Sequence, residues 1–527
     1  MSQELVTIKI NEKEVQVPAG INVIEAAATI GIEIPHYCYH SRLSSPAVCR
    51  MCLIHVEGAR KLQPACITEV REGLEVRTDT PEVKEAVRDV LELTLANHPL
   101  DCPICDQAGE CGLQDYYEEV GLHNSNMTVS KVAKSDIVGV GPTLVHDADR
   151  CILCSRCVRF CKEITKTNEL TITNRGDHAV VSAVKRVDNP YSTNIADICP
   201  VGAFTQKDFR FKCRVWYLKS VDSICAGCER GCNVVLDHYR GEIQRIRPRD
   251  NDDVNASWMC DHGRLLYKEV HSPNRITKPM IRKTTGLVEV SWEEAIDVAT
   301  RLMREAGPTV IGQGSAHASN EDSYLFSSLL KLLKAPKFAA LPEGLPGWED
   351  VNGELLRRSD RTPNRKGSEL FSDNEDFLKL MEERASVAVI LQEDVLPDPK
   401  SFENMRGVIY LGSHHTATSD VATVVFPITT WAEYTGSFVN FQSRIQKFNR
   451  AVLPATGVQP AWKVFDWLIQ ALGGQSFDRV DVIFNAMAEE VNFFNGVTFS
   501  QLGTAGVVSA SVSPSSETSV DKKTVTT

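Results

Sequence analysis

The chain has 527 residues, of which 43% are hydrophobic and 24% are charged, as in an ordinary globular protein. Its length predicts several domains, because single hydrophobic cores stop growing at roughly 250 to 300 residues. The formal net charge of −12 argues against a nucleic-acid-binding protein, which normally carries a basic face. The sequence contains no apolar run of about 18 or more residues, and its N-terminus lacks the charged-then-apolar pattern of a signal peptide. We therefore expect a cytoplasmic protein.

The first hundred residues predict a small β-rich module followed by a helix. Two strands are expected at Leu5–Ile10 and Val15–Val17, joined by a polar turn, and a short helix is expected at Val23–Ala28. Thr80 and Pro81 form a typical helix start, with a capping hydroxyl followed by proline at the first helical position. Apolar residues then recur at helical spacing almost as far as His98.

The cysteines are the most informative feature of the chain. All 17 lie between Cys38 and Cys260, and the second half has none. A disulfide framework would require an oxidising compartment and usually a small domain, and neither applies here. Metal ligation is the better interpretation.

The first cysteine set suits a [2Fe–2S] cluster. It follows the spacing C-x10-C-x2-C-x13-C and consists of Cys38, Cys49, Cys52 and Cys66. Four thiolates must converge on two irons, so one loop has to wrap the cluster. The spacing departs from the plant-type C-x4-C-x2-C, so it supports the general class and not a particular type of ferredoxin. Four buried structural cysteines are the alternative.

The second set mixes one histidine with three cysteines, namely His98, Cys102, Cys105 and Cys111. A histidine at a helix end is usually a surface or capping residue. Here it leads directly into the stretch HPLDCPICDQAGEC, in which proline and glycine would bend the chain around a small object. We therefore favour His98 as a ligand. A neutral imidazole in place of a thiolate would make the site less negative and can raise a cluster's potential.

The third set requires a choice between two fourth ligands. Residues 151–161 carry the bacterial ferredoxin run C-x2-C-x2-C-x3-C, whose fourth cysteine ligates the other cluster in two-cluster ferredoxins. Only the last element of a second run survives, as Cys199-Pro200. This predicts one cluster held by Cys151, Cys154, Cys157 and Cys199. A contiguous site that uses Cys161 is the alternative.

The fourth set has the spacing C-x2-C-x3-C-x27-C and consists of Cys225, Cys228, Cys232 and Cys260. Zinc is a genuine competitor, because structural zinc also takes four cysteines, often as C-x2-C pairs. Three other iron–sulfur sites on the same chain favour a fourth cluster, of the [4Fe–4S] type. Cys213 has no partner set and is expected to be a buried, apolar-type cysteine.

The second half of the chain predicts an α/β domain. Apolar runs at Val387–Leu391 and Val408–Leu411 are typical of buried parallel strands, and helical patterns cover residues 293–303 and 323–333. Gly312-x-Gly314 alone is too weak a signal for a phosphate-binding loop. The last twenty or so residues are rich in serine and threonine and predict a disordered tail.

The order of these four sets, with the stretches CILCSRCVRFC and CPVGAF in the third, resembles the G-subunit family of bacterial respiratory complex I over about residues 1–270. That family is equivalent to the mitochondrial 75 kDa subunit. The resemblance implies a [2Fe–2S] cluster at the first set and a [4Fe–4S] cluster at the second, with one histidine and three cysteine ligands. It implies all-cysteine [4Fe–4S] clusters at the third and fourth sets, and it leaves Cys161 outside the ligands. The expected cofactors are therefore one [2Fe–2S] and three [4Fe–4S] clusters.

The second half is similar to the molybdopterin oxidoreductase superfamily. The similarity lies in the stretches RITKPMIRK, VSWEEAID, SAHASNEDSYLF and DVATVVFPITTWAEYTGSFVNFQSRIQ. Active members place a cysteine, selenocysteine or serine on the metal. No cysteine follows Cys260, the stretch KAPKFAALPEGLPGWED is short where a long insertion would lie, and Ser315 is the serine left open as a candidate. We expect no molybdopterin and a domain that has lost catalysis.

The resemblance implies a multidomain α+β and α/β architecture: a β-grasp [2Fe–2S] ferredoxin-like domain, small [4Fe–4S] ferredoxin-like domains and a truncated molybdopterin-oxidoreductase-like domain. The [2Fe–2S] domain is expected at 1–82. The [4Fe–4S] parts are expected at 83–122, with one histidine and three cysteine ligands, at 140–218, which is ferredoxin-like, and at 219–275, which is of the molybdenum- or tungsten-enzyme type. The molybdopterin-oxidoreductase-like domain is expected at 276–505 and the disordered tail at 506–527.

By the same resemblance, the chain is an electron-transfer subunit of NADH:quinone oxidoreductase that binds neither NADH nor quinone itself and has no catalytic residues. Its expected partners are other peripheral-arm subunits, including the subunit that binds FMN and NADH and those that lead to quinone. No nucleic acid is expected, and contact with the cytoplasmic side of the bacterial inner membrane would be indirect. The alternative is the large subunit of an NAD-linked molybdenum formate dehydrogenase or an iron-only hydrogenase. Either would require further metal ligands in the second half.

Overall fold

The computed structural model describes residues 4–122, 124, 127–134, 137–339, 341, 355–373, 375–395, 402 and 405–510. They form two compact units, the first ending at Leu218 and the second beginning at Lys219. Among the helices that the structure describes, none combines the length and the apolar character needed to cross a bilayer.

The first unit begins with a five-stranded sheet in the order β2-β1-β5-β3-β4. Its elements are β1 (Leu5–Ile10), β2 (Lys13–Pro18), α1 (Val23–Ala28), β3 (Leu53–Val56), β4 (Gln63–Pro64), η1 (Ala65–Ile67) and β5 (Glu75–Arg77). The first two strands pair antiparallel and β1 pairs parallel with β5. Helix α1 begins at the Asn22 cap, whose side chain accepts the Glu25 N–H. Both predicted strands and the predicted helix are therefore present in this α+β module.

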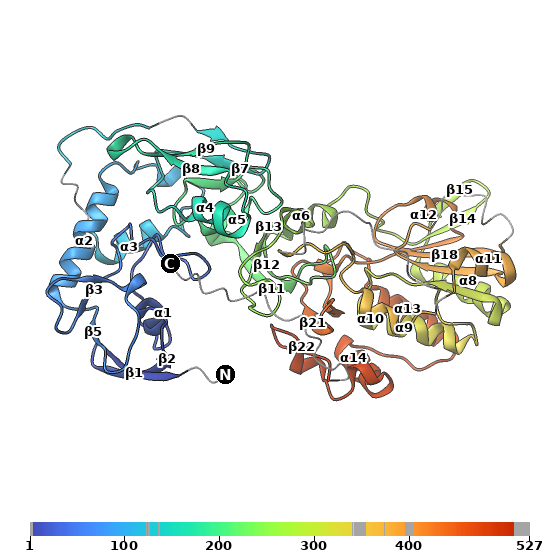
Figure 1. The fold of residues 1–527 in the computed structure, drawn as a ribbon. Helices are drawn as coiled ribbons and strands as arrows, with labels where there is room; N and C mark the ends of the chain where they lie inside the picture. Colours follow the sequence, from blue (N-terminus) through green and yellow to red (C-terminus); the bar gives the residue numbers. More distant parts are fainter. Residues whose placement is uncertain are drawn as a thin grey trace. The chain divides into compact units, whose positions relative to one another are not determined.

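The remainder of the first unit combines helices with short strands. Its elements are α2 (Pro81–Leu95), η2 (Cys102–Ile104), α3 (Gly112–Val120), β6 (Val138–Gly139), β7 (Leu144–His146), α4 (Arg156–Arg159), η3 (Phe160–Ile164), β8 (Leu170–Thr173), η4 (Gly176–His178), β9 (Val180–Ala183), α5 (Asn194–Ile198), β10 (Phe204–Gln206) and η5 (Val215–Tyr217). Helix α2 starts as predicted, because the Thr80 hydroxyl accepts the Val83 N–H and proline occupies the first turn. Helices α2 and α3 pack together (Figure 1). The short strands form one sheet in the order β10-β7-β6 and a separate β8-β9 pair.

The second unit starts with a three-stranded antiparallel sheet, β11-β12-β13. Its elements are β11 (Lys219–Ile224), β12 (Asn233–Tyr239), β13 (Glu242–Pro248), α6 (Asp261–Leu265) and α7 (Tyr267–Val270). Asp237 lies on the central strand with its side chain fully buried, and it accepts hydrogen bonds from the Arg245 and Arg247 side chains of β13. This buried ion pair links two strands of the sheet.

An α/β layer structure follows, built on a six-stranded sheet in the order β15-β14-β19-β18-β17-β16. Its strands and helices are β14 (Met280–Lys283), β15 (Gly286–Glu289), α8 (Trp292–Ala306), η6 (Gly307–Thr309), β16 (Val310–Gln313), α9 (Asn320–Leu332), α10 (Arg365–Glu369), α11 (Phe377–Arg384), β17 (Val387–Leu391), β18 (Gly407–Gly412), α12 (Ala417–Val421) and β19 (Val424–Pro427). Strands β16 to β19 pair in parallel and are buried on both faces. This burial explains their continuous apolar sequences.

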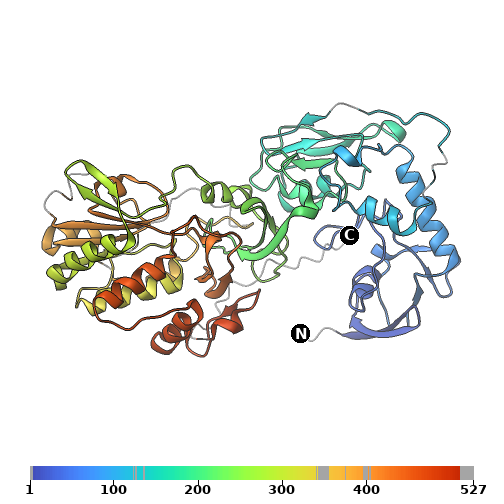
Figure 2. The ribbon, with the colours of Figure 1, turned by 180° about the vertical axis from the view of Figure 1, so that it is seen from behind.

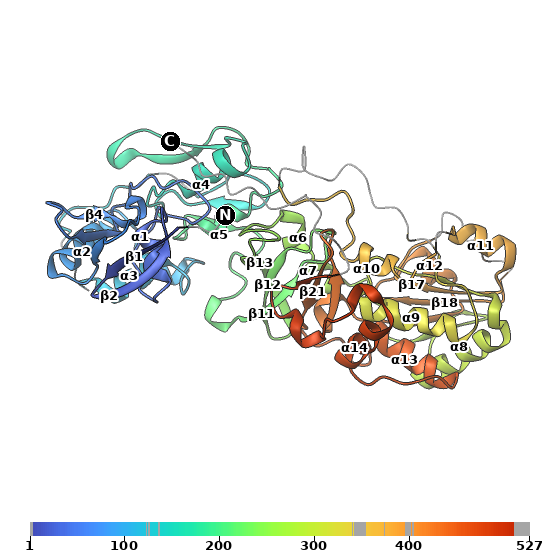
Figure 3. The same cartoon turned by 60° about the horizontal axis from the view of Figure 1, so that its bottom comes forward.

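The two faces of the parallel sheet belong to different cores. Alternate residues such as Val389 and Leu411 pack with α8, α9, α13 (Ala461–Ala471) and α14 (Val480–Glu490). Ile390 and Tyr410 face the other way, toward α11. Figure 1 and, from behind, Figure 2 show the layer of α8, α9 and α13 against the sheet, and Figure 3 shows α9 beside α13. The predicted α/β class is therefore correct.

A three-stranded sheet, β20-β21-β22, completes the second unit. The remaining elements are η9 (Trp431–Glu433), β20 (Gly436–Val439), β21 (Arg444–Phe448), η10 (Asn492–Phe494), η11 (Phe499–Leu502) and β22 (Val507–Val508). Strand β22 pairs with β21, which corrects the predicted start of a disordered tail at residue 506. The rest of that predicted tail, residues 511–527, lies outside the described residues, as does most of the short stretch KAPKFAALPEGLPGWED.

Candidate iron–sulfur sites

The first cysteine set is gathered at one end of the five-stranded sheet. The Cys38 N–H lies 3.5 Å from Cys49 Sγ, and the Cys38 thiol also bonds that of Cys66. Hydrogen bonds from the Cys49 and Cys66 thiols lower the pKa of Cys38, and the Cys66 thiol lowers that of Cys52. The loop can turn this tightly because Ala47 and Arg50 adopt left-handed backbone conformations, with φ of 52° and 58°. All four predicted ligands are therefore together, as a [2Fe–2S] site requires.

The second set surrounds the short helix η2. Cys105 is buried, Cys102 is exposed, and Cys111 caps α3. These three thiols are close enough that the charges of Cys105 and Cys102 contribute to raising the pKa of Cys111 to about 11, although burial is the main cause.

His98 stands just beyond α2 and shares charged neighbours with Cys105. Asp101 and Arg150 influence the pKa of both side chains, and these two residues form an ion pair of 2.5 Å. The buried Nδ1 of His98 has no hydrogen-bond partner in the part of the chain that the structure describes. Burial chiefly lowers the pKa of His98 to about 4, so its imidazole is neutral at neutral pH, as a metal ligand must be.

The third set lines a small hollow in the first unit. The residues around it include Cys151, Cys154, Cys157 and Cys199, together with apolar side chains such as Val181 and Phe204. The backbone reverses sharply between the first three cysteines, since Leu153 and Ser155 have positive φ. Burial raises the pKa of Cys154 and of Cys199 to about 11.

Cys161 does not line that hollow. It is fully buried in the π-helical turn η3, and burial raises its pKa to about 12. Its thiol bonds the side chain of Thr167. This placement supports Cys199, and not Cys161, as the fourth ligand.

The fourth set joins the ends of two strands to a helix in the second unit. Cys225 follows β11 and Cys232 precedes β12, and the Cys225 N–H donates to the Cys232 carbonyl at 2.9 Å. Cys260 caps α6, with its sulfur accepting the Gly263 N–H at 3.5 Å. Burial, and then the charge of neighbouring thiols, raises the pKa of Cys225 and of Cys232.

Two glycines leave the space that ligand thiols occupy in the second and fourth sets. A Cβ on Gly263 would lie 2.9 Å from Cys225 Sγ, and one on Gly202 would lie 2.2 Å from Cys105 Sγ. Among the described residues, no three histidine, cysteine, aspartate or glutamate side chains meet closely enough to hold one metal ion. In a [4Fe–4S] site each ligand binds a different iron, so the relevant feature is a shared hollow with thiols around it. The donor chemistry and the space left by these glycines both fit such clusters.

Cys213 departs from its prediction. It is only half-buried, and its thiol donates to the carbonyl of Arg214 at 3.3 Å. It is therefore not the buried core cysteine that the sequence predicted.

The structure adds arginines that cysteine spacing could not predict. Arg214 donates to the carbonyl oxygens of Pro103 and Cys105 in the second set. Arg159 donates to the carbonyl oxygens of Cys38 and Cys154, in the first and third sets. The bonds from Arg214, and the bond from Arg159 to Cys38, join residues more than 100 positions apart, so no local motif signals them.

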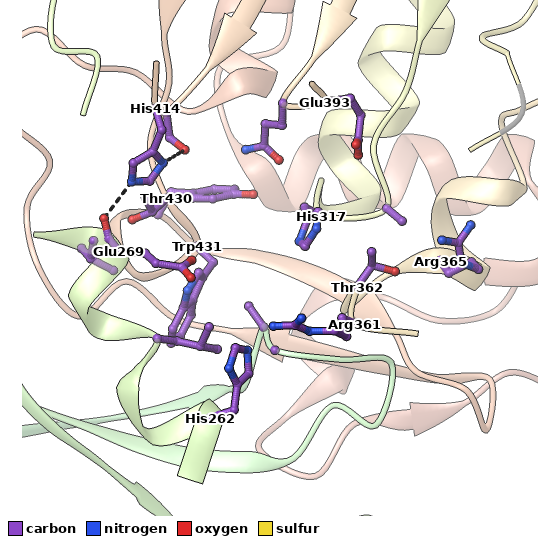
Figure 4. A pocket seen from close by; sticks show the side chains of 18 residues that line it. His262, Glu269, His317, Arg361, Thr362, Arg365, Glu393, His414, Thr430 and Trp431 are labelled. Carbon is purple, nitrogen blue, oxygen red and sulfur yellow. Dashed lines mark hydrogen bonds between the residues drawn. The ribbon is translucent and has the colours of Figure 1, made fainter. Parts of the chain in front are cut away.

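A separate polar pocket lies in the second unit, where the parallel strands end. Residues just beyond β17, β18 and β19 line it, including Glu393, His414 and Thr430 (Figure 4). Ligands of open α/β sheets commonly bind at this carboxyl edge. Arg361 and His317 also face the pocket.

Ser315, the serine that the sequence left open as a metal ligand, is hydrogen-bonded beside this pocket. Its hydroxyl donates to the Glu393 carboxylate at 2.6 Å. Burial raises the pKa of Glu393, although the bond from Ser315 opposes this. Among the described residues that line the pocket there is no cysteine.

Five family profiles match the chain, in segments that follow the structure. They are a 2Fe-2S iron-sulfur cluster binding domain (3–81), an NADH-ubiquinone oxidoreductase-G iron-sulfur binding region (88–126), an NADH-quinone oxidoreductase subunit 3 ferredoxin-like domain (141–205), a molybdopterin oxidoreductase Fe4S4 domain (218–272) and a molybdopterin oxidoreductase domain (400–471). The chain is therefore an iron–sulfur protein with 2Fe–2S and 4Fe–4S binding domains, followed by a partial molybdopterin-oxidoreductase-type domain.

Curated relatives make the relationship more specific. The chain is 39% identical over 331 residues to the NADH-quinone oxidoreductase G subunit 2 of Rhizobium meliloti (strain 1021), covering 62% of this chain and 39% of that protein. It is 37% identical over 326 residues to the mitochondrial NADH dehydrogenase [ubiquinone] iron-sulfur protein 1 of Solanum tuberosum, covering 61% and 44%. The chain is thus a relative of the G subunits of NADH-quinone oxidoreductases. It spans less than half the length of these two relatives.

Among solved structures, a chain of an NAD+-reducing [NiFe]-hydrogenase in the H2-reduced state matches with a TM-score of 0.37 and 29% identity. The match covers 40% of this chain and 91% of that chain.

Proposed function

We propose that the chain relays electrons through four iron–sulfur clusters in the peripheral arm of an NADH:quinone oxidoreductase. The four ligand sets would hold one [2Fe–2S] and three [4Fe–4S] clusters. When bound, each cluster accepts and donates an electron, and the protein controls its potential through burial, ligand type and hydrogen bonds. The observation that carries the proposal is the spacing of 15 cysteines and His98 in four ligand sets, with most of these cysteines buried.

Contacts within the first unit favour a particular order of transfer there. Arg159 bonds the loops of the first and third sets. The third-set segment also touches the second set, because the Gly112 N–H donates to the Pro200 carbonyl and Gly202 abuts the Cys105 thiol. Because the third set contacts both of the others, we place it between them in the relay.

The proposed partners are those of the relatives' complexes: a subunit that binds FMN and NADH as the electron source, and subunits that lead to quinone as the acceptor. The chain itself would bind neither NADH nor quinone. It would associate with the cytoplasmic side of the bacterial inner membrane through other subunits. The polar pocket at the carboxyl edge of the sheet would be a remnant without molybdopterin.

Metal analysis of the full chain, purified anaerobically, tests this function. We expect about fourteen irons and equal acid-labile sulfide per chain, two from one cluster and twelve from three, together with EPR signals of both cluster types on reduction. About ten irons with one zinc would remove the fourth cluster. Molybdenum in the purified chain, or zinc in place of iron throughout, would contradict the proposal.

The space that Gly202 leaves for Cys105 gives a sharper test of the second set. In Gly202→Ala the new Cβ would meet Cys105 Sγ at 2.2 Å, a separation that real contacts do not allow. We expect the variant to lose about four of its fourteen irons and the second-set EPR signal. Gly112→Ala is the matched control, since the nearest atom to its Cβ is the Pro200 carbonyl oxygen at 3.7 Å. Full iron content in the Gly202 variant would show that Cys105 is not held where the site requires it.

A further inference from the structure

A single buried arginine connects two of the ligand sets. Arg159, at the end of α4, is 8% exposed. Its guanidinium donates to the Cys38 carbonyl at 2.5 Å, to the Ser44 carbonyl and, at 3.5 Å, to the Cys154 carbonyl. Cys38 belongs to the first set and Cys154 to the third. One side chain therefore bonds the backbone of a proposed ligand in each.

Neighbouring side chains reinforce this connection. Arg156 donates to the Tyr39 carbonyl and, at 3.2 Å, to the carbonyl of Ile198, which precedes Cys199. The Glu163 carboxylate accepts the Ser44 N–H at 2.9 Å and its hydroxyl at 2.6 Å. The first-set loop, residues 38–44, is thus held against the third set by charge-assisted hydrogen bonds, which are stronger than neutral ones.

The charge of Arg159 acts on both sets because it is removed from water. Arg159 is 8% exposed, and its guanidinium donates to the backbone carbonyls of Cys38 and Cys154, so its charge lies beside a proposed ligand of each set. Charges in the protein interior interact more strongly and are screened less by salt than surface charges. A fixed positive charge beside a cluster favours the form that carries the extra electron.

We propose that Arg159 is a positioning residue that holds the first-set and third-set loops together and, through its charge, raises the reduction potentials of both clusters. The proposal rests on the electron-relay function and goes beyond it, because it assigns the control of two potentials to one side chain.

Three variants of the full chain test this, each followed by EPR-monitored redox titration of the anaerobic protein. In Arg159→Gln we expect the equilibrium constant for one-electron reduction to fall at least about tenfold at both the first and third sets, a shift of about 59 mV each. The second set should keep its potential. Arg159→Lys keeps the charge, so its potentials should lie closer to those of the wild type than to those of Arg159→Gln. Arg214→Gln is the matched control, because Arg214 bonds the Cys105 carbonyl, and it should shift the second set alone.

The possible results distinguish a failure of the inference about Arg159 from a failure of the proposed electron-relay function. Unchanged cluster potentials in Arg159→Gln would overturn the inference but not the proposed electron-relay function. The same would follow if Arg159→Lys shifted the potentials as much as Arg159→Gln does. A wild-type chain without these EPR signals would overturn the relay itself. If Arg159→Gln does not retain its clusters, Arg159→Lys decides, because it keeps the charge beside both loops. Potentials within about 59 mV of the wild type at both sets would support the inference, and a larger fall at both sets would overturn it.

Discussion

Replacing His98 with cysteine is expected to keep the second cluster and lower its reduction potential. The change exchanges a neutral imidazole for a thiolate, so the site gains one negative charge and its reduced form becomes less favourable. Two histidines in place of two cysteines separate Rieske centres from plant-type ferredoxins by about 250 mV or more, so we expect a fall on the order of 100 mV for one. EPR-monitored redox titration measures it, with the iron content staying at about fourteen.

His146→Cys is the matched control for that experiment. Like His98, His146 is buried, has an unpaired ring nitrogen and has its pKa lowered to about 4, chiefly by burial. It belongs to no ligand set, and its ring stacks on Phe204 with 4.4 Å between centroids. The control should leave the second-set potential unchanged. If His98→Cys also left that potential and spectrum unaltered, His98 would not be a ligand, and its orphaned nitrogen would need another explanation.

The sequence predicted those parts of the fold that depend on local or periodic patterns. Thr80-Pro81 marked the start of α2, because a capping hydroxyl and a proline act within one helical turn. The runs 387–391 and 408–411 became the paired parallel strands β17 and β18, because strands covered on both faces are apolar throughout. The grouping of the cysteines into four ligand sets rests on their spacing and stays a prediction, because two of the sets take their fourth thiol, Cys199 or Cys260, from far along the chain.

What the sequence missed depends on contacts between distant residues. The bond from Arg159 to Cys38 joins positions 121 apart, and nothing in the sequence near either residue predicts it. The start of the tail was placed too early because β22 is only two residues long and takes its order from pairing with β21. Cys213 was expected in the core. The sequence alone does not show whether other side chains bury a cysteine that belongs to no ligand set.

The buried carboxylate of Asp237 is expected to be among the most stabilising single groups in the second unit. It accepts the Ser220 hydroxyl at 2.7 Å and hydrogen bonds from Arg245 and Arg247 at 2.8 and 2.7 Å. In Asp237→Asn, Arg245 would stay buried without its counter-ion, and breaking such a pair costs about 3 to 5 kcal/mol. Because Cys225 and Cys232 flank β11 and β12, the fourth cluster should be lost more readily as well.

Hydrogen exchange of the β12 peptide, residues 233–239, measures the loss of stability in this sheet. A local measurement is needed because the chain has several domains, which need not unfold together. We expect exchange that requires opening of the sheet to be about 100-fold faster or more, since each 1.4 kcal/mol corresponds to a factor of ten. Asp481→Asn is the control, because Asp481 forms an ion pair with an exposed arginine, Arg479, and exposed ion pairs contribute little to stability. Equal exchange in the wild type and Asp237→Asn would show that the buried pair is not stabilising.

The pH dependence of the difference in stability between the wild type and Asp237→Asn shows whether burial or the two arginines set the pKa of Asp237. Burial alone would raise the pKa of the carboxyl, but the hydrogen bonds and charges of Arg247 and Arg245 outweigh it, so the pKa lies below its usual value. A lowered pKa means that the stabilisation is fully present above the pKa of the unfolded chain, about 3.9 for aspartate, and is lost as the pH falls through the folded value. The difference between the wild type and Asp237→Asn should therefore stay constant from pH 8 to pH 5. A difference that already shrinks between pH 7 and pH 5 would mean that burial, and not the two arginines, sets the pKa of this carboxyl group.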